Sequence, residues 1–196
     1  MSKKKGIVKD GRYLQHSMGF AHPESPERLG AIYEMIDNPL MSWKFVHIEP
    51  REASHKEIEA IHTPAYVEFI ASTAGKRSVF LDPDTSTCAE TYEVAKLAVG
   101  GVCNAIDSVV TGEVDNAFAL VRPPGHHAEK DTAAGFCVFN NIAIGAMHAI
   151  SKYKFKRILI VDWDLHHGNG TQHSFYGDQR VLYFSTHQYP YYPGTG

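Results

Sequence analysis

The chain has 196 residues, of which 43% are hydrophobic and 21% charged, the composition of a folded globular protein rather than a disordered one. Its formal net charge of −3 gives no electrostatic reason to expect direct nucleic-acid binding. The three cysteines form no C-x-x-C pair and no apolar run approaches membrane-spanning length, which argues against a disulfide framework and a membrane partner. We therefore expect a soluble protein of the reducing cytoplasm.

Short apolar runs alternate with longer amphipathic stretches, which predicts an α/β fold with a mainly parallel sheet flanked by helices. The expected strands are 6–9, 44–48, 116–121, 157–161 and 180–185. The expected helices are 26–36, 64–71, 89–110 and 140–151. The polar, proline-containing segment 81–87 is expected to be a flexible rim loop. Because no repeat or linker interrupts this pattern, we expect a single domain.

Acidic and imidazole groups directly follow the apolar run 158–161, which is expected to be a buried strand. Asp162, Asp164 and His166 occupy alternate positions, so a chain that stays extended would point all three to one face. Ligands of open α/β sheets gather beyond the carboxyl ends of such strands. Carboxylate and imidazole groups together suit zinc or a similar divalent ion. We expect a metal site here rather than a charged strand-to-loop turn.

A second constellation follows the expected strand 116–121. Residues 122–128 read Arg-Pro-Pro-Gly-His-His-Ala, and Pro-Pro-Gly can continue neither a strand nor a helix. This loop is expected on the same rim as the first motif. His126 and His127 are poorly spaced to share a metal but suit proton transfer near neutral pH. Nearby, Gly135 would allow close backbone approach and Phe136 would form an apolar wall, although core packing explains this segment equally well.

The final segment, 186–196, is a loop rich in tyrosine and proline that follows the last expected strand. A parallel sheet that has just gained a strand is normally covered by a further helix. The sequence is therefore expected to represent part of a larger fold.

Together these motifs resemble the zinc-dependent histone deacetylase family, in its class II and bacterial deacetylase-like amidohydrolase branch. The resemblance is carried by 122–128, by Gly-Phe-Cys at 135–137 and by 162–172, with 22–28 and 111–114 in support. It implies the three-layer arginase–deacetylase fold, incomplete at its C-terminal side, with 1–196 as the N-terminal portion of a single deacetylase domain. It also implies a zinc-dependent hydrolase that removes acetyl groups from acetyl-lysine in proteins or peptides, or from small acylated amines such as acetylated polyamines.

The resemblance assigns roles to residues of the two histidine motifs. The implied zinc ligands are Asp164 and His166. His127 is implied to be the general base that activates water and then protonates the leaving amine. His126 is implied to be its partner, oriented by Asp162. Asn169 stands where the group that orients the other histidine belongs; a neutral amide can hold an imidazole but stabilises its cation less than a carboxylate would.

Further roles are implied around this centre. Gly135 and Phe136 resemble the substrate tunnel, with Phe136 beside the acyl-lysine stem. Arg28 resembles an arginine near an internal channel for acetate release, and Asp84 or Asp82 is implied to contact substrate at the rim. The implied structural site for a monovalent cation, usually potassium, comprises Asp162, Asp164, the His166 backbone, Ser185 and Thr186.

Two of the family's functional groups fall outside the sequence. The third zinc ligand, an aspartate, and the oxyanion-binding tyrosine of a Gly-Gly-Tyr segment both come later in the family's chain than residue 196. A catalytic zinc uses three protein ligands and a water, and losing one oxyanion donor costs about 10²–10³-fold in rate. We therefore expect the 196-residue chain on its own to be inactive or nearly so.

Two alternatives remain open at this stage. A manganese ureohydrolase would share the broad architecture, but its Asp-x-His-x-Asp pattern differs in order from Asp162, Asp164 and His166. A non-catalytic paralogue that serves as a binding or scaffold module would account for the two groups that the sequence lacks. Neither the physiological substrate nor the oligomeric state is indicated by the sequence.

Overall fold

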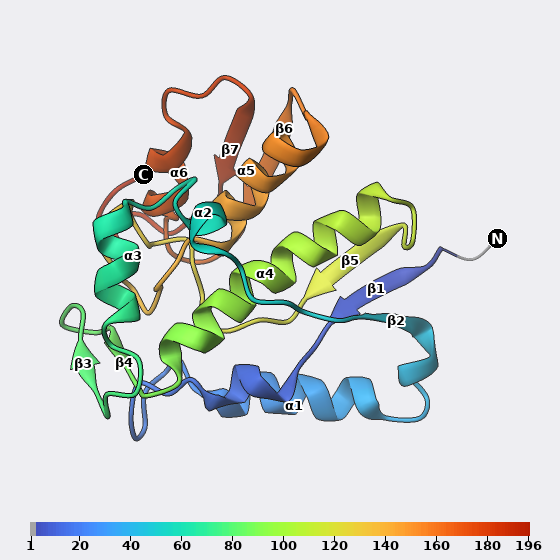
Figure 1. Ribbon diagram of the computed structural model, residues 1–196, viewed down its shortest axis with the longest axis horizontal. Coiled ribbons are helices and arrows are strands. Elements are labelled where there is room, and N and C mark those ends of the chain that lie inside the picture. The colour runs from blue at the N-terminus through green and yellow to red at the C-terminus, as the bar shows by residue number, and fades with distance from the viewer. Residues whose placement is uncertain (1–2) are drawn as a thin grey trace.

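The computed structural model describes residues 3–196, which contain two separate parallel sheets (Figure 1). In the first sheet β1 (Lys5–Val8) lies between β2 (Phe45–Ile48) and β5 (Asn116–Ala119). In the second sheet β6 (Ile158–Asp162) pairs with β7 (Val181–Ser185), so that Asp162 lies opposite Ser185. All five expected strands are confirmed, with small differences at their ends.

The four expected helices are also present. They are α1 (Pro26–Asp37), α3 (Pro64–Ala71), α4 (Thr91–Val110) and α5 (Asn141–Tyr153). Short helical segments that the sequence pattern did not predict are η1 (Gly11–Gln15), η2 (Ser42–Lys44), α2 (His55–Ile58) and α6 (Asn169–Phe175). Over residues 3–196, no helix combines the length and apolar character needed to cross a bilayer.

The segment 81–87 differs from the flexible loop that was expected. β3 (Val79–Phe80) pairs antiparallel with β4 (Ser86–Thr87). The Leu81 N–H donates to the Thr85 carbonyl at 2.8 Å, and Thr85 is fully buried. The segment therefore forms the turn of a short hairpin, because its threonine and serine side chains find partners inside the protein instead of facing solvent.

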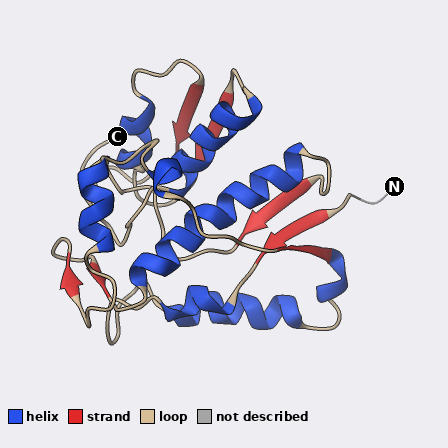
Figure 2. Ribbon diagram, viewed as in Figure 1, coloured by secondary structure: helices blue, strands red, loops and turns tan. Residues whose placement is uncertain are grey.

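Helices cover the first sheet on both sides, which confirms the layered α/β architecture. In Figure 2 the strands β1 and β5 lie between α1 and α4. Tyr33 of α1, Val8 of β1 and Leu97 of α4 belong to one buried apolar cluster. A second cluster joins α3, α4 and α5, and a third packs α5 against the second sheet through Ile160 and Val181.

Candidate active site

The loops that follow β5 and β6 meet at one rim, as their positions after parallel strands predict. The Thr171 N–H at the start of α6 donates to the His126 carbonyl at 3.1 Å. The buried Asn140 amide donates to the Ala128 carbonyl at 3.3 Å and to the Thr171 hydroxyl at 3.2 Å. These bonds join the two histidine motifs into one unit, although about 40 residues separate them along the chain.

His126 is paired with Asp162, as expected. The His126 Nδ1 and the Asp162 Oδ2 are 2.9 Å apart. The Tyr183 hydroxyl donates to the same carboxylate oxygen at 3.0 Å and accepts the Gly168 N–H at 3.1 Å. Burial pushes the pKa of Asp162 upward, but the hydrogen bond and charge of His126 outweigh it and leave the pKa below its usual value. Asp162 is therefore an ionised acceptor that fixes the His126 ring.

His127 is paired with Asn169 on the other side of the histidine pair. The His127 Nδ1 lies 2.8 Å from the Asn169 Oδ1, and the rings of His126 and His127 are in contact, with centroids 3.9 Å apart and planes tilted by 43°. Because an amide oxygen can only accept, Nδ1 carries the proton and Nε2 keeps its lone pair. Burial, helped by the charge of His126, lowers the pKa of His127 to about 4. His127 is thus a neutral base at neutral pH.

Asp164 and His166 lie together next to this pair. The Asp164 Oδ1 is 3.0 Å from the His166 Nδ1 and 4.0 Å from the His126 Nε2. Oxygen and nitrogen ligands held about 2.0–2.2 Å from zinc at a tetrahedral angle lie about 3.3–3.5 Å apart. The observed 3.0 Å is a hydrogen-bond distance, slightly shorter than this separation, and the carboxylate and imidazole are of the donor types that zinc takes.

Asp164 and His166 come together in a turn, not in an extended chain as expected. β6 ends at Asp162, and the chain bends directly after it. The His166 N–H donates to the Asp164 Oδ1 at 2.8 Å, and the Asp164 N–H donates to the Asp162 Oδ1 at 3.1 Å. Asp162 and Asp164 are thus brought to separate partners by a turn that their own carboxylates stabilise, not by strand alternation.

Gly135 lies against the His127 ring and Phe136 lies against His22. Gly135 and Phe136 both have positive φ angles, 54° and 69°. A Cβ at Gly135 would lie 2.4 Å from the His127 ring, so the backbone approaches this ring as only glycine permits. Phe136 packs edge-on against His22 with centroids 4.7 Å apart, and His22 in turn contacts the Asp84 carbonyl at 3.2 Å.

The residues expected to hold a monovalent cation lie next to one another. Ser185 is opposite Asp162 in the second sheet, and the Thr186 N–H donates to the Asp162 carbonyl at 3.1 Å. The Ser185 hydroxyl lies 2.9 Å from the His187 Nδ1. These contacts bring Asp162, Ser185 and Thr186 together at one edge of the second sheet.

Arg28 lies apart from the histidine pair, on the exposed side of α1. It lines a cavity of about 250 Å³ together with Glu24 and Arg122. Arg122 is buried and holds the Glu24 carboxylate with two hydrogen bonds of 2.6 and 2.7 Å. The structure therefore places Arg28 at a cavity, with Arg122 as the deeper charge beside it.

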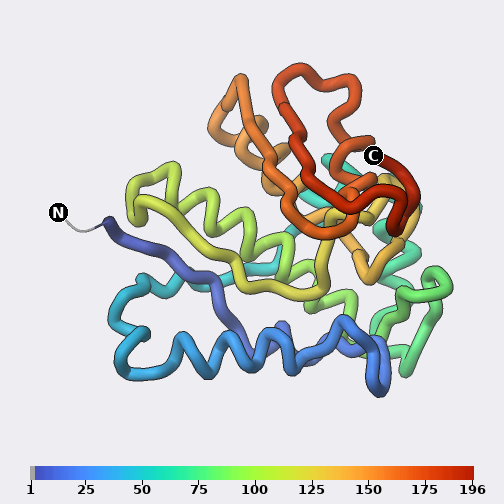
Figure 3. Tube along the Cα trace, turned by 180° about the vertical axis from the view of Figure 1, so that it is seen from behind, coloured from blue at the N-terminus to red at the C-terminus, as the bar shows by residue number. Residues whose placement is uncertain are grey.

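Four side chains of the site were missed by sequence reasoning: Glu129, His173, Tyr183 and Tyr192. Tyr183 could have been found, because it shares a face of β7 with Ser185 at a spacing of two. Glu129 gives no local signal, since its partner Asn169 is 40 residues away. Seen from behind in Figure 3, the C-terminal segment passes near the loop after β5, where the rings of Tyr192 and His127 are 4.9 Å apart.

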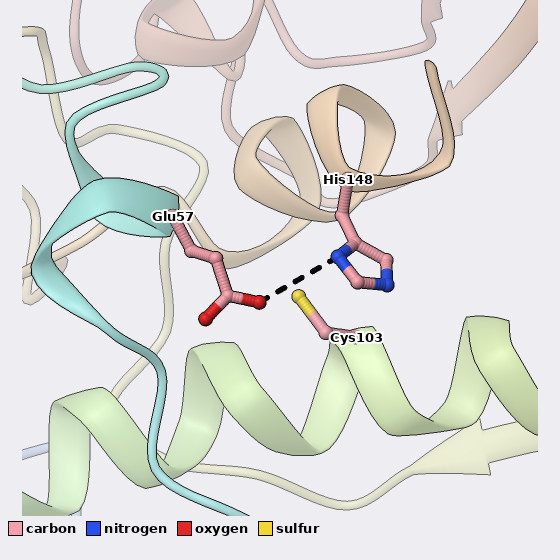
Figure 4. A group of neighbouring side chains, drawn as sticks. All are labelled: Glu57, Cys103 and His148. Atoms are coloured by element: carbon pink, nitrogen blue, oxygen red, sulfur yellow. Dashed lines mark ion pairs between the residues drawn. The ribbon is translucent and has the colours of Figure 1, made fainter. Parts of the chain in front are cut away.

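A separate cluster has the residue types of a metal site but lies elsewhere. Its members are Glu57 of α2, Cys103 of α4 and His148 of α5 (Figure 4). Arg51 binds both oxygens of the Glu57 carboxylate and lowers its pKa to about 2. The His148 Nε2 is 2.7 Å from Asp107, and burial raises the pKa of the Cys103 thiol to about 12. With its carboxylate already paired and its thiol protonated, the cluster is an ion network that joins three helices.

Both the sequence and the structure are similar to those of known proteins. The family model described as the histone deacetylase domain matches residues 22–196. A probable deacetylase of Archaeoglobus fulgidus is 44% identical over 97% of this chain and 53% of its own length. A polyamine deacetylase of Homo sapiens, HDAC10, is 42% identical over 85% of this chain and 26% of its own length.

The crystal structure of the HDA15 HD domain superposes with a TM-score of 0.95 at 38% identity, covering 99% of this chain and 56% of that one. The chain thus spans about half of the archaeal relative and of this solved structure, and a smaller share of the human relative.

Proposed function

The chain belongs to the histone deacetylase domain family, and we propose that the protein that carries it is a zinc-dependent deacetylase. Its substrates are proposed to be acetyl-lysine in proteins or peptides, or small acylated amines of the polyamine type. The names of the relatives, which include both a probable deacetylase and a polyamine deacetylase, support this range. We further propose a cytoplasmic location, because Cys88, Cys103 and Cys137 form no disulfide with one another.

The observation that carries the proposal is the pair of adjacent histidines that are held by different partners. His126 is held by a carboxylate and His127 by an amide, each through its Nδ1, so both Nε2 atoms are left for chemistry. The His126 Nε2 is 4.0 Å from the Asp164 carboxylate. The rings of His127 and His166 are 6.0 Å apart between centroids, so a base stands beside the proposed metal ligands, as hydrolysis of an amide by an activated water requires.

Each residue is assigned one task in this reaction. Asp164 and His166 would hold zinc, which supplies Lewis-acid polarisation of the carbonyl and of water. His127 takes the proton of the attacking water at Nε2 and passes it to the leaving amine nitrogen. His126, ordered by the ionised Asp162, supports the charge that develops beside it.

The wall and the rim are assigned to substrate. Phe136 is proposed to flank the acylated chain, and Gly135, whose backbone packs closely against the His127 ring, is proposed to offer its carbonyl to the substrate amide. Asp84 is proposed to contact substrate at the rim, through the hairpin that packs on His22 and Phe136. Arg28 is proposed to lie near a channel for acetate release, at the cavity that it lines with Arg122. Potassium is proposed for Asp162, Asp164, the His166 backbone, Ser185 and Thr186.

The test uses the whole protein that carries this chain, with metal content and hydrolysis measured on the same samples. We expect about one zinc per protein and release of acetate from an acetyl-lysine peptide or an acetylated polyamine. Asp164→Asn and His166→Gln should lose zinc, whereas His127→Gln should keep zinc and lose about 10²–10⁴-fold in rate. The exposed His47→Gln serves as the control.

Zinc without hydrolysis of any acylated amine would favour the non-catalytic alternative, and two manganese ions would favour the ureohydrolase. Either outcome would overturn the proposed function.

A further inference from the structure

Glu129 directly follows the histidine motif and reaches across to the other loop. Its Oε1 accepts the Asn169 side-chain N–H at 2.6 Å. The same oxygen lies 2.8 Å from the His173 Nδ1 on α6. The Glu129 side chain is 26% exposed, and its backbone is fixed by a hydrogen bond from its N–H to the Thr132 carbonyl at 2.9 Å. A carboxylate therefore stands directly behind the amide that holds His127.

This contact decides which way the Asn169 amide points. With the amide nitrogen on Glu129, the amide oxygen faces the His127 Nδ1 at 2.8 Å. The flipped amide would place its oxygen against the carboxylate, which can only accept when ionised, and lose this bond to repulsion. The orientation of Asn169 in turn requires the proton on the His127 Nδ1, which leaves Nε2 as the basic atom.

The contact also supplies charge that the amide lacks. When His127 takes up a proton, its cation gains from a negative charge nearby, and a neutral amide alone provides none. Glu129 lies one hydrogen bond further away, and charge-assisted bonds in a chain strengthen one another. Through the Asn169 amide, the Glu129 carboxylate therefore stabilises the protonated His127 imidazole.

We propose that Glu129 is a positioning residue for the general base, acting on His127 through Asn169. The expected effect of Glu129 on kcat rests on the proposed function. Its effect on the orientation of Asn169 and on the His127 tautomer does not. The competing explanation is that Glu129 forms an ordinary surface ion pair with His173 and affects only stability.

The experiment measures kcat and KM for an acetyl-lysine substrate in a double-mutant cycle on the whole protein. Glu129→Gln keeps the side-chain shape and removes the charge, and we expect kcat to fall about tenfold with KM nearly unchanged. His173→Gln removes the competing ion pair and should leave kcat within about twofold. On an Asn169→Ala background, Glu129→Gln should lower kcat no further. The proposal would be overturned if Glu129→Gln lowered kcat equally in the presence and absence of the Asn169 side chain. It would also be overturned if His173→Gln lowered kcat as much as Glu129→Gln does.

A second readout does not depend on activity. The ¹⁵N chemical shifts of the His127 ring report which nitrogen carries the proton, and the wild-type protein should show the Nδ1–H tautomer. Glu129→Ala frees the Asn169 amide to rotate and should populate the Nε2–H tautomer. If the wild-type protein hydrolyses no acylated amine yet shows this change, the proposed function fails and the positioning role stands. A His127 tautomer that is unaffected by Glu129→Ala would exclude the positioning role.

Discussion

At the scale of single residues, Gly168 leaves the space that the hydrogen-bonded pair of His126 and Asp162 occupies. A Cβ at Gly168 would lie 2.3 Å from the Asp162 Oδ2, 2.6 Å from the Tyr183 hydroxyl and 3.0 Å from the His126 Nδ1. The φ of Gly168 is −79°, which any residue can adopt. Gly168 is therefore required for space, not for backbone conformation.

Gly168→Ala should displace the Asp162 carboxylate and with it the His126 ring. Displacements of this size in a catalytic group can cost about 100-fold in rate, and we expect kcat for an acetyl-lysine substrate to fall by about that factor. Gly177→Ala is the matched control, because a Cβ there meets nothing within 4 Å. Steady-state kinetics on both variants of the whole protein decide the matter. Equal kcat values for the two variants would contradict this role of Gly168.

At the scale of secondary-structure elements, α4 is fitted to the segment that precedes α2. A Cβ at Gly100 in α4 would lie 1.9 Å from the Arg51 carbonyl oxygen. The Ala53 N–H donates to the Lys96 carbonyl of the same helix at 3.0 Å. The helix and this segment therefore touch backbone to backbone. Gly30 in α1, by contrast, has open space where its Cβ would be.

The same substitution should have opposite effects in these two helices. Gly30→Ala should raise the free energy of unfolding by about 0.5–1 kcal/mol, because alanine loses less entropy in a helix. Gly100→Ala should lower the free energy of unfolding by about 1–3 kcal/mol, since α4 must move away from Arg51. Urea unfolding of the two variants measures both effects. A rise in the free energy of unfolding for both variants would show that helix propensity, not the contact with Arg51, dominates at Gly100.

The same elements show what local sequence can predict. α4 was predictable because its apolar residues repeat at helical spacing, and α1 and α3 because a Ser or Thr N-cap is followed by proline at the first helical position. α2 is too short for such a repeat, although its capping box of Ser54 and Glu57 is a readable signal. α6 is small and polar apart from Phe175, and tertiary contacts hold it: Thr171 is fully buried, and Gly170 packs against the Ala128 carbonyl.

The candidate site follows the same rule. Its two motifs were predictable because each follows a strand of a parallel sheet, and the pairs His126–Asp162 and His127–Asn169 follow from the family resemblance. The contribution of Glu129 was not predictable, since a contact between distant loops leaves no periodic trace in the sequence. Local sequence patterns therefore predict the helices and strands, whereas the site depends on contacts between loops that are distant in the sequence.

At the scale of the whole molecule, the second sheet is packed on one face only. The run 158–161 was expected to be a buried strand, but Leu159 is 60% exposed and Leu182 beside it is 66% exposed. Ile160 and Val181 point the other way, into the cluster with α5. Within residues 3–196, α5 and α6 cover a single side of this sheet, so strand alternation places half of its apolar side chains in solvent.

Two buried histidines couple the stability of the molecule to pH. His62 is buried between Tyr66 and Phe139, and its Nε2 accepts the Asn140 N–H at 2.9 Å. Burial lowers the pKa of His62 to about 4, and burial together with the charge of Arg122 lowers that of His16 to about 3. Both rings are neutral in the folded protein at pH 5, whereas in the unfolded chain, with an ordinary pKa of 6.5, both are mostly protonated.

The folded state should therefore lose stability as the pH falls below about 6.5. The unfolded chain binds the extra proton, so each histidine lowers the free energy of unfolding by about 2 kcal/mol between pH 7 and pH 5. His62→Gln removes one such group, and its stability should fall by about 2 kcal/mol less than the wild-type over this range. The exposed His47→Gln is the matched control. Urea unfolding at both pH values tests this, and a wild-type slope in His62→Gln would show that His62 is already protonated in the folded protein or reached by solvent.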